Sequence, residues 1–164
     1  MRLAIISDTH MPRGARRLPD ACVERLRAAD AILHCGDFMR AEVVDAIAGI
    51  GPPLHAVHGN VDDAAVSRRL PARLQVELGG RTFGLVHDPG PARGRLQRLR
   101  SWFPAADAVL FGHTHMPEHA QDCEGFQIFN PGSPTERRRA PAHTMGAATI
   151  EDGELIFELI VVTA

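Results

Sequence analysis

Residues 3–10 near the start of the chain read LAIISDTH. Four consecutive apolar residues there are followed by an aspartate and a histidine two positions apart. A short apolar run of this kind is typical of a strand that is buried on both faces. Two similar runs follow at residues 31–34 and 54–57. Helical patterns separate the three runs, so we expect β-α-β-α-β order, parallel pairing and right-handed crossovers.

The two intervening helices have recognisable starts and inward-facing stripes. The first begins at Pro19-Asp20, and the second begins near Ala41 and ends at Gly51-Pro52-Pro53. Residues at helical spacing that would face the sheet are Cys22, Leu26 and Ala29 in the first helix and Val43, Val44, Ile47 and Ile50 in the second.

The second half of the chain has a different pattern, with more strands and fewer helices. Residues 74–78 and 82–86 alternate around Gly79-Gly80, which is typical of a hairpin, and a helix at 95–103 precedes a strand at 108–111. Four further strands, which we expect to be antiparallel, are predicted at residues 119–123, 126–129, 145–150 and 155–162. These are too many strands for one small open sheet, so we expect a single domain, residues 1–164, of two packed sheets flanked by helices.

The composition excludes several classes of function. All 18 basic residues are arginine, so Schiff-base chemistry and a phosphate-loop lysine are both excluded. The formal net charge is −2, which gives no basic field for stable nucleic-acid binding. We interpret the clusters Arg16-Arg17, Arg68-Arg69 and Arg137–Arg139 as solvated loops or helix ends.

The cysteines and apolar segments predict a cytoplasmic protein. Cys22, Cys35 and Cys123 are odd in number and widely spaced, which favours reduced thiols. The apolar start of the chain is too short for a secretory signal, and residues 155–162, interrupted by Glu158, are too short to span a bilayer. The oligomeric state stays open, a homodimer included.

Polar residues that could hold metals stand directly behind five of the predicted strands. They are Asp8 and His10, then Asp37, then Asn60 in the motif Gly59-Asn60-x-Asp62, then His87, and finally His113 and His115. Ligands of open α/β sheets bind in the crevice beyond the carboxyl ends of the strands. We therefore expect these side chains to meet at one edge of the molecule.

The chemistry of this set favours a site for two metal ions. Asp37, at a tight glycine turn, carries two carboxylate oxygens and could bridge two cations. Nitrogen and oxygen donors without thiolate suit manganese, iron, zinc or nickel better than copper(I) or calcium. Two such ions about 3.5–4 Å apart would turn a bridging water into a hydroxide nucleophile for in-line attack on phosphorus, so no protein nucleophile is required.

In this order, Asp8-x-His10, Gly36-Asp37, Gly59-Asn60-x-Asp62, His87 and Gly112-His113-x-His115 resemble the calcineurin-like metallophosphoesterase superfamily. The later Asn130-Pro131-Gly132-Ser133 is similar to its compact single-domain branch of bacterial and archaeal phosphodiesterases. The resemblance covers residues 1–153. It implies an α/β fold, a four-layer α/β-β-α sandwich, and hydrolysis of a small phosphate ester by a binuclear centre, for which manganese is our first choice.

The resemblance also implies a role for each ligand. It assigns one metal to Asp8, His10, Asp37 and His115, and the other to Asp37, Asn60, His87 and His113. Asp37 would be the bridge, and we count Asp37, Asn60 and His87 among the catalytic residues as well.

Two positions depart from the family pattern. Many members have a histidine where this chain has Val61, and that histidine helps to protonate the leaving group, so we predict a preference for phosphodiesters and for good leaving groups. Asp88 stands where the family usually has glycine, and it could support His87, repel an anionic substrate or point away.

Other residues near the motifs have more ordinary interpretations. We expect His34, His55, His58, His119 and His143 to be packed or at the surface, with His58 the best of them for a supporting role. Arg13 could anchor phosphate, although an exposed loop position is favoured, and Cys35 would be a small buried residue. Phe38 and Met39 either line the rim or begin a helix, and Asn130 to Ser133 would form a structural loop beside the site.

A protein-interaction scaffold of the same fold is the alternative function, because a fold does not fix a function. A nuclease acting on long DNA is disfavoured by the missing basic field.

Overall fold

The computed structural model describes residues 1–162, whose strands form two five-stranded sheets. Sheet A has the order β10 (Glu154–Val161), β9 (Thr144–Glu151), β1 (Arg2–Ile6), β2 (Ala31–His34) and β3 (Leu54–Ala56). Sheet B has the order β4 (Arg73–Leu78), β5 (Arg81–Val86), β6 (Ala108–Leu110), β8 (Gln127–Asn130) and β7 (Glu118–Gln121). Both sheets mix parallel and antiparallel pairs.

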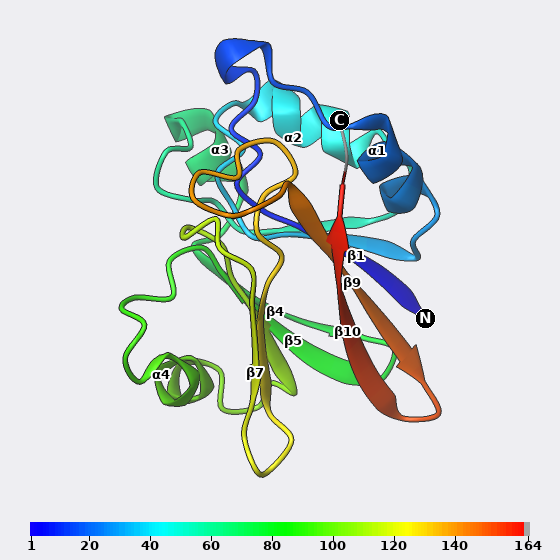
Figure 1. Ribbon diagram of the computed structural model, residues 1–164, viewed down its shortest axis with the longest axis vertical. Helices are drawn as coiled ribbons and strands as arrows, with labels where there is room; N and C mark the ends of the chain where they lie inside the picture. Colours follow the sequence, from blue (N-terminus) through cyan, green and yellow to red (C-terminus); the bar gives the residue numbers. More distant parts are fainter. Residues whose placement is uncertain (163–164) are drawn as a thin grey trace.

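Helices cover the outer faces of the two sheets (Figure 1). The helices α1 (Asp20–Arg27), α2 (Ala41–Ala48) and α3 (Ala64–Arg69) lie on sheet A, and α4 (Arg95–Trp102) lies on sheet B. A short 3₁₀ turn, η1 (Arg13–Ala15), follows β1. The predicted four-layer sandwich of helices, sheet, sheet and helix is confirmed.

The apolar run of β1 is continuous because both of its faces are buried. Ala4 and Ile6 pack against the helices of sheet A, whereas Leu3 and Ile5 pack between the two sheets. Fully burying a side chain of this size contributes about 1.5–3 kcal/mol relative to leaving it exposed. A third cluster joins α4 to sheet B, where Gly84 allows the ring of Phe103 to approach the strand.

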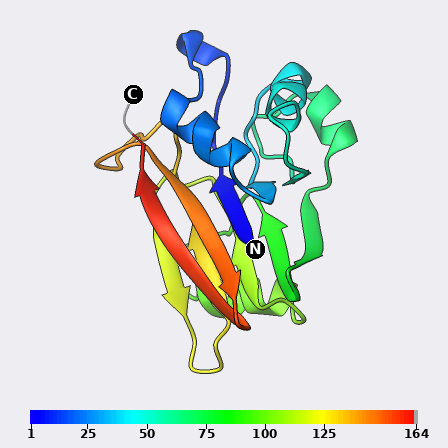
Figure 2. The ribbon, with the colours of Figure 1, turned by 90° about the vertical axis from the view of Figure 1, so that its right-hand side faces the viewer.

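The parallel order predicted for the first half is confirmed. β1 pairs in parallel with β2, and β2 with β3, while β9 pairs antiparallel with the other edge of β1. β9 and β10 form a long antiparallel hairpin at the edge of sheet A (Figure 2).

The structure corrects several details of the second half. β8 is antiparallel to β7, as expected, but parallel to β6. The strands predicted at 119–123 and 126–129 are Glu118–Gln121 and Gln127–Asn130, because the Asp122 carboxylate accepts hydrogen bonds from the amides of Glu124 and Phe126 and shapes the turn. α3 was not predicted, since its six residues are too few for a periodic signal; the Asp63 carboxylate caps it by accepting from Ala65 N and Val66 N.

The carboxyl ends of β1, β2 and β3 in sheet A meet those of β5 and β6 in sheet B. Asp8 N donates to Gly36 O within sheet A, Gly112 N donates to His87 O within sheet B, and His113 N donates to Asp8 Oδ2 at 3.0 Å from one sheet to the other. The predicted motifs therefore meet at a single edge of the sandwich. Among the described residues, none of the helices is long and apolar enough to cross a membrane.

Candidate metal centre

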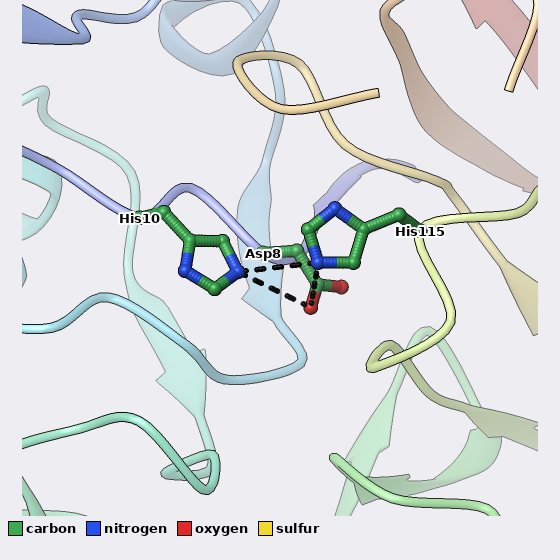
Figure 3. Close-up of side chains that lie close together, drawn as sticks. All are labelled: Asp8, His10 and His115. Atoms are coloured by element: carbon green, nitrogen blue, oxygen red, sulfur yellow. Dashed lines mark hydrogen bonds and ion pairs between the residues drawn. The ribbon is translucent and has the colours of Figure 1, made fainter. Parts of the chain in front are cut away.

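Asp8, His10 and His115 form the first of two groups of side chains that could hold a metal ion (Figure 3). The Nε2 atoms of His10 and His115 lie 3.2 Å apart, and His115 Nε2 lies 3.3 Å from Asp8 Oδ1. All three side chains are buried. Figure 3 shows both rings directing Nε2 towards the Asp8 carboxylate, so the three donors converge on one point.

Asp37 connects this group to a second one around His87. Asp37 Oδ2 lies 3.5 Å from His10 Nε2 and 3.2 Å from His87 Nε2. The amide oxygen of Asn60 lies 3.0 Å from His87 Nε2 and 2.9 Å from His113 Nδ1. All seven side chains predicted as ligands are therefore brought into one network, with Asp37 placed between the two halves.

The hydrogen bonds behind two of the rings determine what faces the centre. His87 Nδ1 lies 2.8 Å from the carbonyl oxygen of Cys35, and His115 Nδ1 lies against the carbonyl oxygen of Glu136. A carbonyl only accepts, so each Nδ1 carries the proton, and in the neutral ring Nε2 is a bare acceptor. Each Nε2 faces a carboxylate oxygen, of Asp37 for His87 and of Asp8 for His115, so a proton or a divalent cation can lie between the two atoms.

The electrostatics of the cluster fit a cation site. Burial opposes ionisation of Asp8 and Asp37, but the surrounding histidines outweigh it and lower the pKa of both carboxyl groups. Burial likewise opposes the charge on His87, yet Asp37 and Asp8 raise the pKa of this ring to about 8. Two buried carboxylates thus stay ionised and hold positive charge beside them.

Five of the seven candidate ligands have left-handed backbone conformations, which are uncommon for residues other than glycine. The φ angles are 56° at Asp8, 44° at His10, 63° at Asp37, 67° at His113 and 58° at His115. Such conformations cost on the order of 1–3 kcal/mol each and persist only where the surroundings enforce them. The strand ends therefore turn sharply here, which aims the side chains at a common centre.

Glycines make room for the close approach of these loops. A Cβ atom on Gly112 would lie 2.6 Å from Asp8 Oδ2, and one on Gly36 would lie 2.9 Å from His87 Nδ1. Gly36 also has a φ of 95°. The glycines in the Gly-Asp and Gly-His motifs are thus required by the packing of the ligands themselves.

Asp62 supports the centre from behind without belonging to it. Its carboxylate accepts hydrogen bonds from the backbone amides of Asp37, Met39 and Gly59, at 3.1, 2.6 and 2.6 Å. These bonds fix the loop after β2 against the loop after β3. The Gly-Asn-x-Asp motif contained this residue, but the spacing alone did not reveal its task.

Glu136 was missed by the sequence analysis. Its Oε2 atom lies 3.6 Å from His10 Nδ1, its Oε1 atom accepts a hydrogen bond of 3.0 Å from Arg16, and its backbone carbonyl contacts His115. Oε2 is buried and has no hydrogen-bond partner among the described residues. In the sequence, Glu136 could have been noticed only because it lies three residues after Ser133, the last residue of the predicted loop beside the site. In the structure the Ser133 hydroxyl donates a hydrogen bond to Asp8 O.

The residues with ordinary interpretations are placed much as expected. The Val61 side chain is exposed, while its amide donates to Asp37 Oδ1 at 3.1 Å. Asp88 points away from the centre, because its Oδ1 accepts from Gly90 N at 2.8 Å. Arg13 is exposed. Within the described residues, its guanidinium forms no hydrogen bond or ion pair with any of the seven candidate ligands.

Buried residues around the loops play structural parts. His34 is fully buried, stacks on Phe38 and accepts a hydrogen bond from Gly36 N, and burial lowers its pKa to about 3. Cys35 is buried and contributes only its carbonyl oxygen to His87. Asn130 donates to Gly112 O at 3.1 Å, so the loop beginning there adjoins the site as predicted.

The other histidines lie outside the cluster. His55 is half-buried on β3, and burial lowers its pKa. His119 contacts Gln127 Oε1 at 2.8 Å and makes edge contacts with two phenylalanine rings that stack on each other. His143 is partly buried. His58 is half-buried and adjoins the centre through its position beside Asn60.

Residues 1–153 match the calcineurin-like phosphoesterase superfamily domain. The chain belongs to this superfamily. A probable metallophosphoesterase of Methanocaldococcus jannaschii is 33% identical over 155 residues, which is 93% of this chain and 77% of that protein.

Solved structures agree with the superfamily fold. A Thermotoga maritima protein determined by solution NMR superposes with a TM-score of 0.77 at 30% identity, covering 98% of this chain and 99% of that one. Vps29 of Entamoeba histolytica complexed with zinc superposes with a TM-score of 0.77 at 23% identity, covering 98% and 99%. This calcineurin-like domain therefore has the family's fold, and its relatives include proteins described as probable metallophosphoesterases.

Proposed function

We propose that this protein is a binuclear metal-dependent phosphoesterase that acts on phosphodiesters. The observation that carries the proposal is the convergence of histidine nitrogens and ionised carboxylates at one buried point, where a single cation can contact several of them at once. The family match supports the reaction class.

The seven candidate ligands would be shared between two metal ions. Asp8, His10 and His115 would hold one ion, Asn60, His87 and His113 the other, and Asp37, within 3.5 Å of a histidine on each side, would bridge them. When bound, two divalent ions supply charge neutralisation and an activated water. The donors suit manganese first, and iron, zinc or nickel as well.

The preference for diesters follows from Val61. Its exposed aliphatic side chain cannot donate a proton, whereas general-acid assistance is typically worth 10²–10⁴-fold. Esters whose leaving group departs without protonation should therefore react best. We include a cytoplasmic location in the proposal, since Cys22, Cys35 and Cys123 are all free.

Metal reconstitution tests the proposal directly. Metal-free protein would be loaded with Mn²⁺, Fe²⁺, Zn²⁺ or Ni²⁺ and assayed with bis(p-nitrophenyl) phosphate, cyclic nucleotides, lipid diesters and nucleoside monophosphates. Asp37→Asn and His115→Gln should lose both metal content and activity, while Glu151→Gln, an exposed change outside the centre, should keep both. Full turnover by Asp37→Asn, or fast hydrolysis of alkyl monoesters only, would contradict the proposal.

A protein-interaction scaffold is the second candidate. Three large apolar side chains of β10, Ile156, Leu159 and Val161, are exposed on the edge strand of sheet A. Exposed apolar residues on an edge strand favour a partner. Metal-loaded protein that hydrolyses none of the esters would favour this function.

A further inference from the structure

A pocket of about 240 Å³ opens directly from the half of the centre that contains Asn60 and His87. Its remaining wall includes His58, Arg73 and Asp88. A group attached to a phosphate at the metal centre could extend into this space without leaving the protein surface. The side chains that line the pocket would therefore help to select the organic group of the substrate.

The strand register explains why an arginine lies so close to the centre. β4 and β5 are antiparallel, and Arg73, the first residue of β4, pairs with Val86, the residue before His87. The loop that carries Asn60 is held nearby, because His58 N donates to Pro71 O at 3.0 Å. Arg73 thus lines the pocket from the amino end of a strand, and the strand-end motifs of the sequence do not include this position.

The guanidinium of Arg73 lies over an aromatic ring, and its positive charge is not paired with a carboxylate of the described residues. It lies 4.0 Å from the ring centroid of Trp102, at the end of α4. Within residues 1–162 it has no carboxylate at ion-pair distance, whereas Arg16, Arg81, Arg95 and Arg100 all do. Stacking on an aromatic ring leaves the edge N–H groups of a guanidinium free to bind an anion.

The other charges of the pocket do not satisfy Arg73. The Asp88 carboxylate is turned into its own loop by the Gly90 amide. His58 Nδ1 lies 3.1 Å from the carbonyl oxygen of Gly59. Arg73 therefore carries the one fixed positive charge among the residues that line the pocket, and its guanidinium lies over Trp102.

We propose that Arg73, supported by Trp102, binds a second anionic group, a phosphate or a carboxylate, on the organic arm of the diester substrate. The proposal rests on the proposed function for the place of the reacting phosphate. It assigns the physiological substrate to diesters that carry more than one negative charge. Guanidinium groups suit both anions, because their paired N–H donors match two oxygen atoms.

Three matched substrates test this assignment by kinetics. They are p-nitrophenyl propyl phosphate diesters whose propyl end carries a phosphate, a carboxylate or a hydroxyl group. With the manganese-loaded enzyme, one of the two substrates with a charged end group should have a KM about tenfold below that of the substrate with the hydroxyl group. This difference is the effect of one charge-assisted hydrogen bond. Arg73→Gln should remove that advantage, so that the KM values of the three substrates become similar, and Arg27→Gln, on the exposed end of α1, should change nothing.

Trp102 gives a readout that does not need turnover, because it is the single tryptophan of the chain. Its fluorescence would be titrated with dipropyl phosphate diesters bearing the same three end groups. A response to a charged end group that Arg73→Gln abolishes supports the subsite, even if no ester is hydrolysed and the proposed function fails. Equal responses in the wild type and Arg73→Gln, or equal KM values for all three substrates, overturn the subsite and leave the proposed function standing.

Discussion

The carboxylate of Glu136 lies 3.6 Å from Nδ1 of His10, while Nε2 of the same ring faces Asp8 and Asp37. The other carboxylate oxygen of Glu136 is held by Arg16 at 3.0 Å. A carboxylate behind a metal-binding histidine fixes the orientation of the ring and increases the basicity of the nitrogen that faces the metal. Glu136 thus occupies the position of a supporting residue for the first group.

Removing this carboxylate should weaken metal binding without unfolding the protein. We expect Glu136→Gln to lower the affinity for Mn²⁺ by about 10–100-fold, the usual effect of losing such a support. Isothermal titration calorimetry of the metal-free protein measures it, with Glu151→Gln as the control for loss of a surface charge. Unchanged affinity in Glu136→Gln would show that His10 is oriented by other contacts.

Asp62 should matter for stability as well as for metal binding. Asp62→Ala leaves the amides of Asp37, Met39 and Gly59 without their acceptor. We expect a loss of about 3 kcal/mol in the free energy of unfolding, because unpaired donors retain their desolvation cost. Urea denaturation of the metal-free proteins checks this, and Asp62→Asn, which keeps one acceptor oxygen, should fall between the wild type and Asp62→Ala.

The metal-free protein should be most stable near pH 6.5. The pKa of His87 is raised to about 8, so the stability that it contributes is present below pH 6.5 and is lost as the pH rises through 8. This loss amounts to about 2 kcal/mol. The pKa of His34 is lowered to about 3, so stability also falls as the pH drops below 6.5, where the unfolded chain binds the proton first.

Urea denaturation between pH 4.5 and 9 measures both limbs. His87→Gln should remove the decline above pH 6.5 and keep the decline below it. A variant that loses stability above pH 6.5 as steeply as the wild type would mean that another group titrates there.

Metal binding should stabilise the folded protein. At a free concentration of Mn²⁺ about 100 times its Kd, the free energy of unfolding should rise by about 2.7 kcal/mol per site. For a chain of this size the melting temperature should rise by on the order of 5–10 °C. Differential scanning calorimetry with and without EDTA tests this, and Asp37→Asn, which lacks the central carboxylate, should show little or no shift.

Patterns among residues close together in the chain were enough to predict much of the fold. The runs at residues 3–6, 31–34 and 54–57 became adjacent parallel strands, because continuous apolar segments separated by helices have few other ways to be buried. The six-residue α3 and the parallel pairing of β8 with β6 could not be predicted. A short helix has no period to detect, and the partner of a strand depends on the chain's return path.

The candidate centre divides in the same way. The sequence by itself predicted the seven candidate donor side chains, because the strand ends carry them in short motifs whose order along the chain can be recognised before folding. Only the tertiary structure decided that Glu136 lies behind His10, that Asp62 binds three amides, and that Arg73 pairs with Val86, the residue before His87. Apart from the local bond between Gly59 and Asp62, these relationships join residues 23 or more positions apart or depend on strand register, and such contacts exist only once the sheets have formed and packed against each other.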